Sequence, residues 1–116
     1  MDTEVNMDGK VFIVEKNDGD DAQLPPGSTF HFKQADGEIS ATYSGGRVAK
    51  GTLKGRIIGD ELHHRYTQTL TDGRRFTGRA TVEIRQREDG LLELLDRWAW
   101  QSPQSDGICL MVEARY

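Results

Sequence analysis

The feature that most constrains the fold is an alternation of apolar and polar residues between closely spaced turn signals. In residues 76–85, FTGRATVEIR, apolar or small residues take every second position, and Thr, Arg and Glu take the others. Because side chains of a strand point alternately to two faces, this period of two indicates a strand with one buried face. Turn signals such as ADG, SGG, TDG and EDG recur along the chain, and no stretch sustains helical spacing. We therefore expect an all-β fold.

The turn signals divide the chain into about eight expected strands. They lie near residues 9–15, 28–34, 38–44, 47–58, 61–70, 74–87, 91–101 and 106–115. Nearly all connections are of hairpin length, so consecutive strands pair antiparallel. Such a meander with one apolar face closes most economically into an up-and-down barrel without free edges. The sequence predicts one lipocalin- or avidin-like (calycin-type) β-barrel domain over residues 1–116.

Glycines recur inside the expected strand 47–58. Strict alternation puts Gly51 and Gly55 on the inner face, in register with Ala49, Leu53 and Ile57. A glycine inside a strand marks a sharp bend or a close approach to the backbone. Two interpretations stay open here: the glycines permit curvature, or they keep space inside the barrel.

Several motifs resemble those of a family of small bacterial proteins of roughly this length. The motifs are FHFKQ, ATYSGG, RY followed by DG and TG, and an acid before W-x-W, and they span most of the chain. Asp96 stands where the relatives carry Glu. Members are often labelled N-acetylglutamate synthase, and the resemblance implies that activity. The residues offer no strand-to-helix turn for the pyrophosphate of acetyl-CoA, so an acetyltransferase is a minor alternative.

Polar residues interrupt the expected inner face. A buried charge or amide needs a hydrogen-bond partner, and aromatic walls with a few convergent polar groups are typical of small-molecule sites. We predict a site for a small apolar or aromatic ligand inside the barrel. A purely structural role for Asp96, and an enzyme with Asp96 or His64 as its base, are the alternatives. The predicted ligand-binding residues are Tyr43, His64, Tyr66, Gln68, Asp96, Trp98 and Trp100.

No metal or cofactor is expected. His63 and His64 are adjacent, and adjacent strand residues point to opposite faces, so they cannot hold one ion together. The chain has no Gly-rich phosphate loop and no CxxC pair. Its single cysteine, Cys109, lies in an apolar strand and is interpreted as a small buried hydrophobe.

The charge pattern suggests a second class of function. The net charge of −4 disfavours general binding to nucleic acid or anionic membranes, and the lone cysteine and polar N-terminus predict a cytoplasmic location. No run approaches a membrane span. Outward positions of three adjacent strands nevertheless form a basic patch, which makes an interaction module or a homo-oligomer the runner-up hypothesis. The patch comprises Lys50, Lys54, Arg56, Arg65, Arg75, Arg79 and Arg85.

Overall fold

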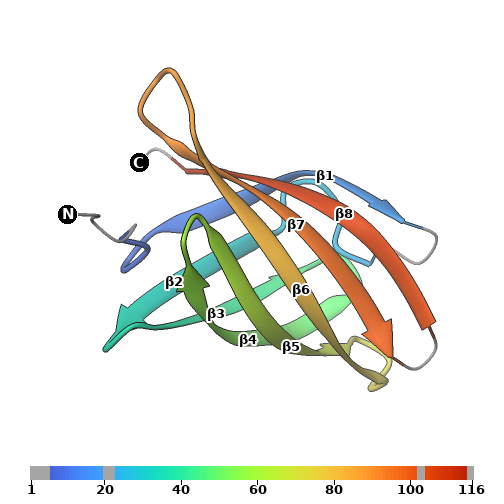
Figure 1. The fold of residues 1–116 in the computed structure, drawn as a ribbon. Coiled ribbons are helices and arrows are strands. Elements are labelled where there is room, and N and C mark those ends of the chain that lie inside the picture. Colours follow the sequence, from blue (N-terminus) through green and yellow to red (C-terminus); the bar gives the residue numbers. More distant parts are fainter. Residues whose placement is uncertain (1–5, 20–22, 102–103, 115–116) are drawn as a thin grey trace.

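The computed structural model describes residues 6–19, 23–101 and 104–114, with side chains described for 6–18, 23–99 and 106–114. This part of the chain forms a closed barrel in which eight strands pair in sequence order, each antiparallel to its neighbours (Figure 1). The predicted up-and-down barrel is confirmed. The strands are β1 (Val11–Gly19), β2 (Thr29–Ala35), β3 (Glu38–Gly45), β4 (Val48–Ile58), β5 (Glu61–Leu70), β6 (Arg75–Gln86), β7 (Leu92–Gln101) and β8 (Gln104–Glu113).

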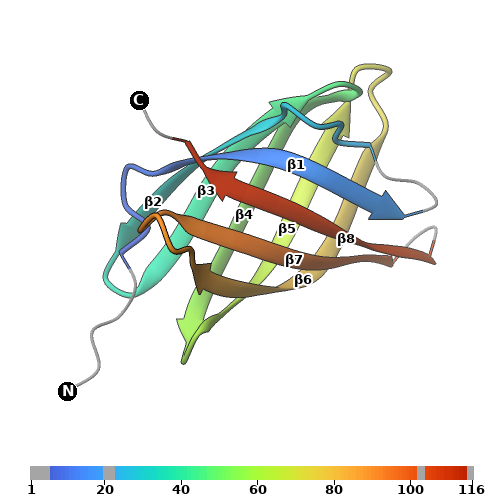
Figure 2. The same cartoon turned by 90° about the horizontal axis from the view of Figure 1, so that it is seen from above.

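Pairing of the first strand with the last closes the barrel. β1 lies between β2 and β8, with Ile13 opposite Thr29 on one side and Val112 on the other (Figure 2). Within the part of the chain that the structure describes, every strand pairs with a neighbour on both sides, which limits the sheet edge that another chain could extend. In the described residues no helix is long and apolar enough to cross a membrane.

β1 extends to Gly19, beyond the predicted end near residue 15, and an irregularity within it changes which residues face inward. The pairing with β8 shifts between Val14 and Lys16, after which Asn17 lies opposite Cys109. Strict alternation from Phe12 and Val14 would have placed Lys16 inside the barrel. The shift keeps Lys16 exposed and brings Asn17 into the interior.

A second irregularity corrects the predicted inner face of β4. The register with β5 shifts between Val48 and Lys50, so Val48 is buried and Ala49 is exposed. The prediction that Ala49 points inward is therefore wrong. Beyond the shift, Gly51 and Leu53 are buried as predicted.

The interior is divided between an apolar end and a polar end. Met7 is fully buried at the apolar end, where its backbone N–H donates to Gln34 Oε1 at 2.8 Å. The buried polar side chains lie toward the opposite end, where the β1–β2 connection crosses the barrel. The apolar end, near the β2–β3, β4–β5 and β6–β7 turns, also contains five of the largest fully buried side chains: Phe12, Ile39, Leu62, Leu94 and Met111.

The inward glycines lie opposite rings. Gly51 pairs with Tyr43, Gly55 with His64, Gly78 with Tyr66 and Gly107 with Trp98, each on a neighbouring strand. A Cβ atom at Gly51, Gly78 or Gly107 would collide with the opposing ring, and one at Gly55 would collide with the backbone of His63 and His64. The mid-strand glycines therefore permit close approach: Gly51, Gly78 and Gly107 leave room for an adjacent ring, and Gly55 leaves room for the neighbouring backbone.

This packing predicts a difference between the two faces of the barrel. Gly51→Val and Gly78→Val should each lower the free energy of unfolding by about 1–3 kcal/mol, because the added atoms overpack the interior. Thr52→Val and Thr77→Val, at exposed positions on the same strands, should change it by less than about 0.5 kcal/mol. Urea unfolding measures both, and equal effects at the two sets of sites would contradict this inner-face packing.

Candidate functional site

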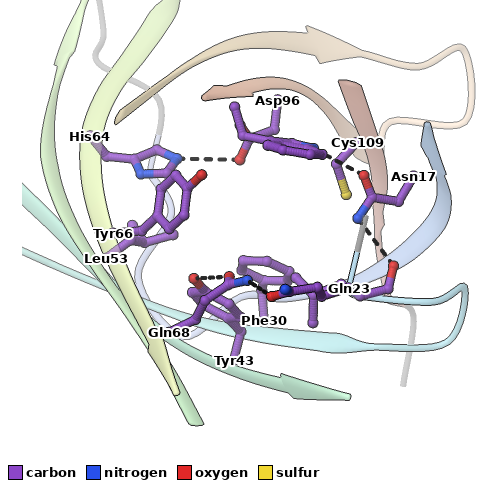
Figure 3. A pocket seen from close by; sticks show the side chains of 12 residues that line it. Asn17, Gln23, Phe30, Tyr43, Leu53, His64, Tyr66, Gln68, Asp96 and Cys109 are labelled. Carbon is purple, nitrogen blue, oxygen red and sulfur yellow. Dashed lines mark hydrogen bonds and ion pairs between the residues drawn. The ribbon is translucent and has the colours of Figure 1, made fainter. Parts of the chain in front are cut away.

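A small cavity of about 40 Å³ lies in the polar half of the barrel (Figure 3). Its wall combines aromatic rings, a few aliphatic groups and convergent polar side chains from seven strands and the β1–β2 connection. The lining residues are Asn17, Gln23, Leu24, Phe30, Tyr43, Leu53, His64, Tyr66, Gln68, Asp96, Trp98 and Cys109.

The strongest polar feature is a buried pair formed by His64 and Asp96. The two side chains come from β5 and β7 and point toward each other, with Nε2 of the imidazole 3.2 Å from Oδ2 of the carboxyl (Figure 3). The strand between them, β6, contributes Ala80, which lies opposite both His64 and Trp98. Because alanine is small, it leaves space on the inner face of β6, and the His64 and Asp96 side chains meet across this space.

Two of the four polar side-chain atoms of this pair take no part in the bond between them. His64 Nδ1 and Asp96 Oδ1 are both buried and have no hydrogen-bond partner among the described residues. When the carboxylate is ionised and the imidazole is neutral, the imidazole donates from Nε2 and its Nδ1 is an acceptor. In this state the cavity wall contains two buried acceptors, His64 Nδ1 and Asp96 Oδ1, that have no partner within the residues that the structure describes.

A chain of amide and hydroxyl groups forms a second side of the cavity. Tyr43 Oη donates to Gln68 Oε1 at 2.9 Å, and Gln68 Nε2 donates to Gln23 Oε1 at 2.7 Å. The ring of Tyr43 stacks on Phe30 with centroids 4.4 Å apart. These contacts hold the tyrosine and the glutamine in fixed orientations.

Asn17 links the aromatic wall to the connection that crosses this end of the barrel. Its Oδ1 accepts from Trp98 Nε1 at 3.0 Å, and its Nδ2 donates to the backbone carbonyl of Leu24 at 3.1 Å. Leu24 and Gln23 are buried at 7% exposure each, so they cover the cavity.

The structure brings six of the seven predicted site residues around this one cavity. Tyr43, His64, Tyr66, Gln68 and Asp96 line it together with Trp98, whereas the side chain of Trp100 lies outside the described part of the chain. Their role in binding a ligand stays a prediction.

The other lining residues were not predicted from the sequence as part of the site. Asn17 was missed because the pairing shift in β1 reverses its orientation. Gln23 and Leu24 were missed because a connecting segment has no periodicity. One residue in the sequence did indicate the shift in β1. Strict alternation would have pointed Lys16 into an apolar barrel, and a buried lysine without a partner is so unfavourable that a bulge was to be expected. The remaining three look like ordinary core residues in the sequence: Phe30, Leu53 and Cys109.

Within the described residues, no cluster of three or more His, Cys, Asp or Glu side chains could hold a metal ion. His63 is exposed and lies 3.2 Å from Glu61, whereas His64 is buried. The two histidines therefore face opposite sides of β5, as strand geometry requires.

Comparison with protein-family models matches residues 5–114 to the family described as avidin-like protein. The match covers almost the whole chain and agrees with the closed eight-stranded barrel. The chain belongs to the avidin-like family. Searches of curated proteins and of solved structures find no match.

Three expectations go beyond membership of the avidin-like family. The resemblance to bacterial proteins labelled N-acetylglutamate synthase and the cytoplasmic location both stay predictions. A homo-oligomer also stays a prediction. The outer face of β8 offers one surface for it, because Ile108 is 45% exposed and Leu110 and Val112 are half-buried beside it.

Two titratable groups in the wall of the avidin-like barrel stay protonated. Burial raises the pKa of the Tyr43 phenol well above its ordinary value, and the charges of Tyr66 and Asp96 add to the effect. Burial, together with the negative charge of Asp96, also raises the pKa of the Cys109 thiol. Since the thiolate is the reactive form of cysteine, Cys109 is an inert part of the wall.

The raised thiol pKa predicts a loss of stability in alkali. Above the ordinary thiol value of 9.0 the unfolded chain releases this proton while the folded chain keeps it. The unfolded state then binds fewer protons, so the free energy of unfolding should fall as the pH rises above this value, by at most about 1.4 kcal/mol per pH unit for this one group.

Urea unfolding of the wild type and of Cys109→Ala across this range measures the effect. The variant lacks the group and should show the shallower fall with pH, whatever its stability at neutral pH. Parallel pH profiles for the two proteins would contradict a protonated, buried Cys109.

Proposed function

We propose that this avidin-like barrel binds a small organic molecule that has an apolar or aromatic body and at least one N–H or O–H donor. The proposal rests on the pair of acceptors without protein partners in the described part of the chain, His64 Nδ1 and Asp96 Oδ1. A ligand that donates to them would satisfy groups that this part of the fold leaves unsatisfied.

Burial makes these two acceptors costly. His64 and Asp96 are each 5% exposed, and a buried polar group without a partner costs about 1–3 kcal/mol. A ligand donor that reaches either acceptor recovers part of this cost on binding. The same arrangement disfavours ligands that present only acceptors, because they would bring lone pairs against lone pairs.

The apolar side of the site favours a ligand with an apolar or aromatic body. Phe30, Leu53, Tyr66 and Trp98 surround the cavity, and all four are at most 8% exposed. Aromatic rings in such walls stack on flat or apolar groups. A ring or short apolar body with an N–H group at one end fits these walls best.

The volume of the cavity limits the ligand. About 40 Å³ accommodates only a few heavy atoms, or one or two water molecules. A larger ligand therefore has to displace the cover formed by Gln23 and Leu24. Their bonds to Gln68 and Asn17 would be exchanged for bonds to the ligand.

Two other hypotheses concern the same site. One is an enzyme with His64 or Asp96 as its base, and the other is the N-acetylglutamate synthase activity. The first requires a substrate in contact with the His64–Asp96 pair, so the ligand experiment also bears on it.

The experiment compares two lactams that differ in one donor. 2-Pyrrolidinone carries an N–H group, whereas N-methyl-2-pyrrolidinone carries none. Only the first should raise the melting temperature of the wild type and change the emission of Trp98, because stabilisation requires binding to the folded state.

The matched variant is Asp96→Asn. The asparagine oxygen can still accept from His64 Nε2, but its NH₂ group then faces the cavity and replaces an acceptor with donors. The variant should keep most of its thermal stability and lose the response to 2-pyrrolidinone. Equal responses of the wild type to both lactams, or a response that survives Asp96→Asn, would contradict the proposal.

A further inference from the structure

The outer face of β2–β6 carries a row of cations that the ligand site does not use. Across the sheet, Lys33 lies opposite Ser40, Ser40 opposite Lys54, Lys54 opposite Arg65, and Arg65 opposite Arg79. The four basic side chains are all exposed. We call Lys33, Lys54, Arg65 and Arg79 the cation row.

The cation row is unfavourable for the isolated protein. Lys54, Arg65 and Arg79 are direct cross-strand neighbours, whose Cβ atoms lie about 4.5–5.5 Å apart, and like charges in this arrangement destabilise a sheet. None of the four cations forms an ion pair within the described residues. Elsewhere on the surface, Lys10 pairs with Glu113.

A second row adds neutral hydrogen-bond donors beside the cations. Thr42, Thr52, Thr67 and Thr77 lie opposite one another on β3–β6, two residues along each strand from the members of the first row or from Ser40. Each threonine hydroxyl can donate one hydrogen bond. The two rows together present only ammonium, guanidinium and hydroxyl groups over five adjacent strands.

The surface around these rows is hollowed. Two shallow depressions of about 590 and 470 Å³ are both lined by Lys54 and Arg65. The first also includes Lys33 and three of the threonines, and the second includes Arg79. A partner can therefore lie along the row and contact cations at several points.

We propose that the cation row binds an extended acidic segment of a partner protein. The charges of Asp and Glu side chains complement the four unpaired cations and relieve their mutual repulsion. A nucleic acid would use exposed Phe, Tyr or Trp rings for base stacking, yet Phe32 and Tyr66 point inward on these strands and are at most 6% exposed. The exposed rings that line the two depressions are the smaller imidazoles of His31 and His63. Four strand spacings of about 4.8 Å make the row about 19 Å long, which an extended peptide of about six residues spans.

The test uses a fluorescein-labelled peptide of about six glutamates, with a glutamine peptide of the same length as its control. Fluorescence anisotropy at about 20 mM salt should detect binding of the glutamate peptide only, and about 200 mM salt should abolish it. Lys54→Gln combined with Arg65→Gln should weaken binding at least about fivefold. This variant should melt no lower than the wild type, since it removes like-charge contacts.

Arg47→Gln combined with Arg97→Gln is the matched control, because both cations are exposed and, like those of the row, form no ion pair within the described residues. It removes the same charge from exposed cations outside the row, and it should change binding less than about twofold. Absence of binding to the glutamate peptide, or equal weakening by the two double variants, would overturn the proposal. Tighter binding of an oligothymidylate with the same number of charges would overturn it in favour of a nucleic acid.

Discussion

The site depends on the opposition of a glycine and a ring across neighbouring strands. Tyr43, His64, Tyr66 and Trp98 each lie opposite a glycine, and a Cβ atom at any of these four glycines would collide with the ring or the backbone that faces it. A barrel of eight strands has little interior volume, and side chains normally fill it. At Gly51, Gly78 and Gly107 the missing side chain leaves room for a ring with a polar atom, and at Gly55 it leaves room for the backbone that carries His64.

This arrangement separates two tasks within one barrel. The apolar end, with Phe12 fully buried among aliphatic side chains, supplies hydrophobic stabilisation. At the polar end, the bond between His64 and Asp96 and the chain from Tyr43 to Gln23 fix the positions of polar groups. Two acceptors there lack a partner among the described residues, which a structure selected only for stability would avoid.

The sequence predicted the parts of the structure that follow from strict alternation, and little beyond them. Eight strands, their order and the inward direction of His64 and Asp96 all follow from the period of two. The errors arise where that period is interrupted, because a register shift in β4 turned Ala49 outward and one in β1 turned Asn17 inward. The only sign of the shift in β1 was the lysine at position 16, and the shift in β4 has no local signature in composition, since it is set by the partner strand. For the same reason, the ring that faces Gly51 and the direct opposition of cations across β4, β5 and β6 could be known only from the register.

We infer that the His64–Asp96 pair is retained for a ligand and contributes no net stability. The decisive measurement is urea unfolding of the double variant His64→Leu and Asp96→Leu, because replacing both members of a buried polar pair removes unsatisfied atoms along with the bond. We expect a free energy of unfolding equal to that of the wild type, or higher by about 1–4 kcal/mol. A loss of about 3 kcal/mol or more would contradict this inference and would make the pair part of the scaffold.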